Sequence, residues 1–89
     1  MTSIGLIAGS GRLPFLFAEA AKAQGLWVHA VAFEGEADDS LAPAVSSLSW
    51  VKVGQADGVV RALKERGVSQ AVMAGGIGRI RSLTQARPD

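Results

Sequence analysis

The chain has 89 residues, of which 48% are hydrophobic and 19% are charged, and its formal net charge at pH 7 is +1. This length and composition predict one small globular domain and exclude a disordered segment. The near-neutral charge argues against nucleic acid as a partner, and the absence of cysteine excludes disulfides, thiolate metal sites and cysteine nucleophiles.

The sequence contains no segment that we expect to target or anchor it. No apolar run approaches the roughly 18 residues that a membrane-spanning helix needs. The N-terminus lacks the basic region and long apolar stretch of a signal peptide. A reducing cytoplasm is the compartment that fits these features.

The first element is an apolar strand that runs into a glycine-rich turn, the entry unit of a nucleotide-binding α/β domain. The strand is expected over residues 3–8, and Gly9 and Gly11 then allow the backbone to turn tightly and approach a ligand. Amides at the start of the following helix, together with Arg12, favour an anion such as phosphate. The dinucleotide fingerprint requires a third glycine where this chain has Pro14, so a turn that needs glycine only for its geometry is an equal alternative.

A helix is expected over residues 13–24. Pro14 suits its first turn because proline has no N–H to lose, and Gly25 is a suitable residue to end it. Its predicted buried face consists of four apolar residues at helical spacing: Leu13, Leu16, Phe17 and Ala20.

Three further apolar stretches predict the other strands, and a second helix precedes the last of them. These elements are the strands 26–33, 48–53 and 68–74 and the helix 56–66, whose predicted buried face is Ala56, Val59, Val60 and Leu63. Such alternation predicts an α/β fold, a small three-layer domain with a mostly parallel sheet of about four strands in the order 3-2-1-4. His29 is the only histidine, and its mid-strand position favours a structural role.

An acidic loop, residues 34–40, follows the second strand. Glu34 lies about 20 residues beyond the glycine turn, where a dinucleotide-binding domain has the acid that bonds ribose. We favour a solvated loop leading into a short helix near residues 41–45. The loop carboxylates do not have the spacing of a calcium site.

The fourth strand runs into a second glycine-rich turn, residues 75–79. Ligands of open α/β sheets bind outside the carboxyl ends of the strands, so we expect both glycine turns to wall one crevice. The candidate substrate-binding residues are Gly9, Ser10, Gly11, Arg12, Gly75, Gly76 and Arg79.

With these motifs the chain resembles the LpxI-type UDP-2,3-diacylglucosamine pyrophosphatases, specifically their N-terminal domain. The resemblance rests on residues 4–14 (Ile-Gly-Leu-Ile-Ala-Gly-Ser-Gly-Arg-Leu-Pro), 54–55 (Gly-Gln), 74–79 (Ala-Gly-Gly-Ile-Gly-Arg) and 87–89 (Arg-Pro-Asp). It implies a small Rossmann-like N-terminal domain over residues 1–79. It also implies a connector, residues 80–89, towards a C-terminal catalytic domain that has no counterpart in this sequence.

The resemblance implies a Mg²⁺-dependent hydrolase of bacterial lipid A (lipopolysaccharide) biosynthesis. Its substrate is a small lipidated UDP-sugar, UDP-2,3-diacylglucosamine, which water cleaves at the pyrophosphate to lipid X and UMP. Since the family's metal-binding and catalytic carboxylates are attributed to the second domain, we expect no catalytic residue and no bound Mg²⁺ in this chain, which alone would be inactive. The lipidated substrate implies a cytoplasmic enzyme at the inner-membrane surface, and apolar surface exposed by the missing domain could drive self-association into a homo-oligomer.

Two other functions stay open as alternatives. A generic nucleotide- or NAD-binding Rossmann-like module fits the first glycine turn but not Pro14. A stand-alone interaction domain of the receiver type requires an aspartate at the end of a central strand, whereas the expected strands end in Ala8, Phe33, Val53 and Ala74. Ligand preference separates the three: lipid X or a UDP-sugar, NAD, or none.

Overall fold

The computed structural model describes residues 2–76; Arg79 and the expected connector, residues 80–89, lie outside the described residues. The elements alternate along the chain as expected. They are β1 (Ser3–Ala8), α1 (Leu13–Ala23), β2 (Trp27–Phe33), the 3-10 helix η1 (Asp39–Ala44), β3 (Ser47–Val51), α2 (Ala56–Glu65) and β4 (Ala71–Ala74). No helix within residues 2–76 is both long and apolar enough to cross a membrane.

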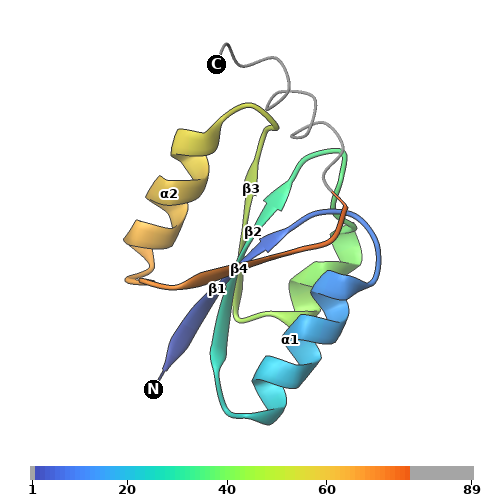
Figure 1. Cartoon of the computed structure of the whole chain (residues 1–89), viewed down its shortest axis with the longest axis vertical. Coiled ribbons are helices and arrows are strands. Elements are labelled where there is room, and N and C mark those ends of the chain that lie inside the picture. The colour runs from blue at the N-terminus through green and yellow to red at the C-terminus, as the bar shows by residue number, and fades with distance from the viewer. Residues whose placement is uncertain (1, 77–89) are drawn as a thin grey trace, which may run out of the picture.

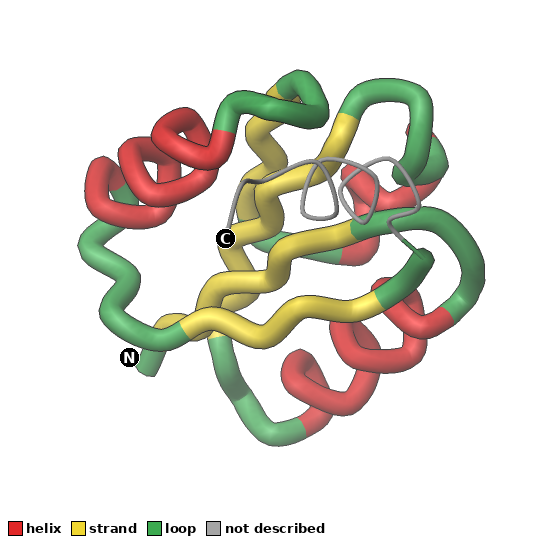
Figure 2. Tube along the Cα trace, turned by 45° about the horizontal axis from the view of Figure 1, so that its top comes forward, coloured by secondary structure: helices red, strands yellow, loops and turns green. Residues whose placement is uncertain are grey.

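The four strands form one parallel sheet in the order β3-β2-β1-β4, which confirms the predicted α/β fold and strand order (Figure 1). Helix α1 and η1 lie on one face of the sheet and α2 lies on the other, giving three layers (Figure 2). The sheet order follows from handedness. The right-handed connections from β1 to β2 and from β2 to β3 run in one direction across the sheet. The connection from β3 to β4 through α2 runs back past β1 and lies on the opposite face.

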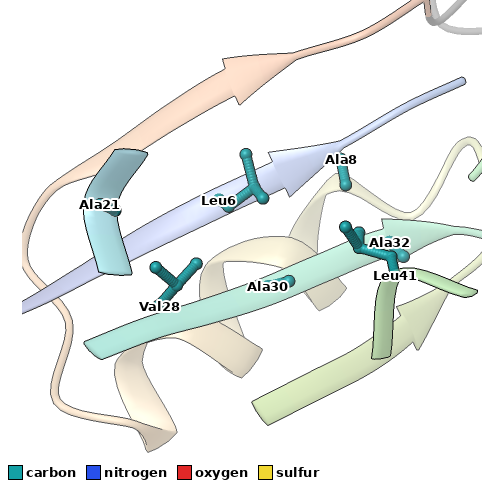
Figure 3. Close-up of a cluster of buried hydrophobic side chains, with 7 residues drawn as sticks. All are labelled: Leu6, Ala8, Ala21, Val28, Ala30, Ala32 and Leu41. Carbon is teal, nitrogen blue, oxygen red and sulfur yellow. The ribbon is translucent and has the colours of Figure 1, made fainter. Parts of the chain in front are cut away.

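The core on the α1 face is built largely from small side chains of the two central strands (Figure 3). Four of its seven buried members are alanines, so α1 and η1 can approach the sheet closely. The buried members are Leu6 and Ala8 of β1, Val28, Ala30 and Ala32 of β2, Ala21 of α1 and Leu41 of η1. On the α2 face, Val31, Phe33, Val51 and Val59 form the second cluster.

The predicted buried face of the first helix was wrong in part: Phe17 packs against the core, but Leu13, Leu16 and Ala20 are exposed. Leu13 and Leu16 are 60% and 50% exposed. The buried residues of α1 are Pro14, Ala18 and Ala21. The small residues face the alanine-rich strands because they allow the closest approach of helix and sheet, and Phe15 and Phe17 pack beside them, whereas Leu13 and Leu16 are exposed.

The second helix differs from expectation in the same way. Val59 is buried and Leu63 packs against its cluster, as predicted, but Val60 is 52% exposed. Among the described residues, α2 packs mainly over β2 and β3.

Gly5 marks a tight contact between β1 and the α2 layer. A Cβ at this position would lie 2.7 Å from Cδ2 of Leu63, 3.1 Å from Cβ of Ala71 and 3.2 Å from Cγ1 of Val68. The strand therefore carries glycine because three neighbours occupy the space of a side chain.

We predict that Gly5→Ala lowers the free energy of unfolding by about 1–3 kcal/mol, the usual cost of overpacking a core. Leu63→Ala removes the atom that the new methyl would meet. Urea denaturation of both single variants and the double variant checks this. A Gly5→Ala cost that is not smaller in the Leu63→Ala background would contradict the assignment of the clash.

Candidate functional site

The two glycine turns follow neighbouring strands, β1 and β4, and their backbones are hydrogen-bonded to each other. The amide of Gly9 donates to the carbonyl of Ala74 at 2.9 Å. Ser10 and Gly76 exchange two backbone bonds, of 2.8 and 2.9 Å, and the Ser10 hydroxyl donates to the Gly76 carbonyl at 3.0 Å. Among the described residues, these hydrogen bonds close the predicted crevice into a backbone junction. The amides of Gly9, Ser10 and Gly76, which were candidates for binding phosphate, already donate to protein carbonyls.

Gly75 is required by this junction. A Cβ there would lie 2.5 Å from the carbonyl oxygen of Ser10 and 2.9 Å from the carbonyl carbon of Gly9, and its φ is +101°. Gly11 is different: its φ is +90°, but nothing lies within 4 Å of a Cβ built on it. Gly75 therefore allows two backbones to meet, whereas Gly11 only allows the chain to turn into α1.

The N-terminus of α1 opens directly beyond the junction. Arg12 is its N-cap residue and is exposed, and no side chain caps the helix. The first turn contains Pro14 and no acidic residue. The amide of Leu16 donates to the carbonyl of Arg12 at 3.1 Å, whereas the N–H groups that precede it in the turn have no helical carbonyl to bond.

This arrangement can hold an anion. First-turn amides, the positive end of the helix dipole and the Arg12 guanidinium all favour negative charge at one place. That place is the point where the strand order reverses, between β1 and β4, which is where open α/β sheets bind ligands. Of the candidate residues, the structure brings together Gly9, Ser10, Gly11, Arg12, Gly75 and Gly76; Arg79 lies outside the described residues.

The acidic loop has its own structural role. The Asp38 carboxylate accepts hydrogen bonds from the backbone amide of Ser40 at 2.8 Å and from its hydroxyl at 2.7 Å, and so caps η1. These bonds stabilise the charged form and hold the pKa of Asp38 below its ordinary value of 3.8. Glu34 is exposed and its amide donates to the carbonyl of Val51 at 2.9 Å. Within residues 2–76 no three histidines or carboxylates are placed to share a metal ion.

His29 lies near the opposite end of the sheet from the glycine turns. Its Nδ1 is 2.7 Å from Oγ of Ser47, its neighbour on β3, and its ring centroid is 6.5 Å from that of Trp27. The hydrogen bond ties β2 to β3 and supports the structural role predicted for this histidine.

A hollow beside the N-terminus of α2 was not foreseen. It encloses about 430 Å³ and is lined by Gly54, Gln55, Asp57, Gly58 and Arg61. It lies after the carboxyl end of β3, at the same edge of the sheet as the glycine turns. The Gly54-Gln55 sequence was the signal that could have indicated this hollow. Gly54 makes the turn into α2 with a φ of +101°.

We predict that Gly75→Ala destabilises the domain more than Gly11→Ala. Gly11→Ala costs only the positive-φ penalty of about 1–2 kcal/mol, because its methyl group meets no other atom. Gly75→Ala adds a collision with the backbone of Ser10. Chemical denaturation of the two variants checks the order, and equal costs would contradict the close approach.

Asp38 gives a pH-dependent prediction. Because its pKa is lowered in the folded state, its stabilising contribution is complete above pH 3.8 and disappears as pH falls through the lower, folded-state pKa. Asp38→Ala should therefore reduce stability at pH 7 and cost less stability at pH 2.5. Urea denaturation at both pH values checks this, with the exposed neighbour Asp39→Ala as the control.

Comparison with known families completes the description of the site. A family model described as the LpxI N-terminal domain matches residues 3–89. No curated protein gives a significant match to the chain. The family match spans nearly the whole sequence and includes both glycine turns, so the chain belongs to the LpxI family, as its N-terminal domain.

Proposed function

We propose that this domain binds the phosphate-bearing part of UDP-2,3-diacylglucosamine, as the substrate-binding part of an LpxI-type pyrophosphatase of lipid A biosynthesis. The observation that carries the proposal is the uncapped N-terminus of α1 with the exposed Arg12, at the point where the strand order reverses. The substrate class is inferred from the resemblance to LpxI-type pyrophosphatases, which the family match supports. The first-turn amides of α1 and the Arg12 guanidinium are the groups that would recognise an anion.

The contribution of these residues is to hold and orient the phosphate groups. Backbone amides and a guanidinium stabilise charge on phosphate oxygens without acting as bases or nucleophiles. The Ser10 hydroxyl already donates to the Gly76 carbonyl, and the described residues of the two turns include no carboxylate or imidazole. The domain by itself would therefore bind without hydrolysing. The reaction that yields lipid X and UMP would need groups from elsewhere in an LpxI enzyme.

We expect the Mg²⁺ that the family resemblance implies to bind elsewhere in an LpxI enzyme. Mg²⁺ is usually held by one or two carboxylates together with substrate phosphates, and the described residues of the two glycine turns carry no carboxylate. No three acidic or histidine side chains gather within residues 2–76, and Asp38 caps η1. No step is assigned to a metal in this chain. The lipidated substrate would bring the whole enzyme to the cytoplasmic surface of the inner membrane.

An amide NMR titration of the 89-residue chain tests the proposal, with UMP, short-chain lipid X and NAD as separate ligands. We expect UMP or lipid X to shift the amides of Gly11, Arg12 and Leu13. Arg12→Ala should weaken binding roughly 10- to 100-fold, as for loss of one charge-assisted hydrogen bond. Arg66→Ala is the matched control, because Arg66 is an exposed arginine at the C-cap of α2.

Each outcome of the titration decides between stated alternatives. Shifts at these amides with NAD alone would favour a generic dinucleotide-binding module. Equal affinity in the Arg12→Ala and Arg66→Ala variants would remove Arg12 from the site. An absence of shifts with all three ligands would mean either that another part of an LpxI enzyme supplies the affinity or that the glycine turns serve only geometry. Repeating the titration on a two-domain LpxI protein separates these two.

A further inference from the structure

Helix α1 carries an exposed apolar stripe on the side that faces away from its buried residues. Leu13, Leu16, Ala20 and Ala23 are spaced at i, i+3, i+7 and i+10, so they lie in one row along the helix. Leu13 and Leu16 are 60% and 50% exposed, and both alanines are exposed as well. The helix is an outer layer of the molecule (Figure 2). We call these four residues the α1 stripe.

The composition of α1 is unusual for a helix on the surface of a domain. It has only two charged residues, Glu19 and Lys22, and both lie to one side of the stripe. Helix α2, the outer layer on the other face of the sheet, has four charged residues, and all are exposed: Asp57, Arg61, Lys64 and Glu65. A helix that is apolar on two opposite sides is typical of one with a second apolar neighbour. We therefore expect the stripe to meet an apolar environment outside the described domain.

The stripe begins at the proposed anion site. Arg12, the N-cap residue of α1, directly precedes Leu13, and a helical rise of about 1.5 Å per residue places Leu16 only about 6 Å further along the axis. The headgroup layer on each side of a bilayer is about 5–8 Å thick. A protein that binds the phosphate of a lipid still embedded in a membrane therefore brings the surface next to that phosphate into the bilayer interface.

We propose that the α1 stripe docks on a lipid bilayer and so holds the Arg12 site at the level of the lipid headgroups. This rests on the proposed function, because the lipidated substrate supplies the bilayer. The contact is apolar, since the charges that flank the stripe are two positive and one negative: Arg12, Lys22 and Glu19. Two partly exposed leucines bury less apolar surface than a single acyl anchor, whose membrane binding is already reversible. The stripe therefore orients the domain on the membrane without anchoring it.

Amide NMR of the 89-residue chain in phosphatidylcholine bicelles that contain a spin-labelled lipid tests the docking surface without any substrate. We expect line broadening at Leu13, Leu16 and Ala20, and none at Val60 of α2, which lies on the other face of the sheet. An equimolar mixture of phosphatidylcholine and phosphatidylglycerol should strengthen bicelle binding by no more than about fivefold, because the flanking charges amount to one net positive charge.

Leu16→Ser and Val60→Ser are a matched pair, because the two side chains are 50% and 52% exposed in the outer helices of opposite faces. Leu16→Ser should weaken bicelle binding about fivefold, as expected for the loss of a leucine side chain that is buried on one side. Val60→Ser should leave bicelle binding unchanged. Both variants should keep the melting temperature of the parent chain and its affinity for UMP, because neither side chain belongs to the core or to the anion site.

Three results would overturn the proposal: no broadening at the stripe, equal effects of Leu16→Ser and Val60→Ser on bicelle binding, or contact that requires phosphatidylglycerol. Shifts at the stripe that grow with protein concentration in the absence of lipid would also overturn it, by identifying a second copy as the occupant.

The UMP titration separates this proposal from the proposed function, because UMP has no acyl chain and needs no bilayer. Binding of UMP without broadening at the stripe would reject the docking surface and leave the anion site. Arg12→Ala provides the converse control, since it should weaken UMP binding and leave the broadening at Leu16 in phosphatidylcholine bicelles.

Discussion

The backbone junction between the two glycine turns is the constraint on which the site depends. Ser10 and Gly76 are 66 positions apart, yet they exchange two main-chain hydrogen bonds and a third from the Ser10 hydroxyl. The bonds hold the carboxyl ends of β1 and β4 together and so determine where α1 begins. They are possible only because position 75 has no Cβ.

This constraint changes how the glycine motif is understood. A Gly-x-Gly turn suggests backbone that is kept bare for a ligand, but here part of that backbone is engaged with the neighbouring turn. What is left for an anion is the first turn of α1 and the charge of Arg12. Such a site recognises negative charge and supplies no proton-transfer group. This fits our proposal that the domain positions a phosphorylated substrate.

The sheet is well covered at its centre and open at one side. Both faces of β2 are buried, by α1 and η1 on one side and by α2 on the other, whereas Met73 of β4 is largely exposed. A domain of this size buries only about two-thirds of its unfolded surface, so its stability margin is small.

The sequence by itself determined the element order, the parallel sheet and its strand order, because alternating apolar runs and the handedness of crossovers leave few other topologies. It also placed both glycine turns at the same sheet edge. Only the tertiary structure decided which face of α1 is buried: periodicity favoured Leu13 and Leu16, but the alanine-rich strands select the small residues Ala18 and Ala21. The reason for Gly75 was likewise hidden, because a close approach between backbones far apart in the chain leaves no local pattern in the sequence.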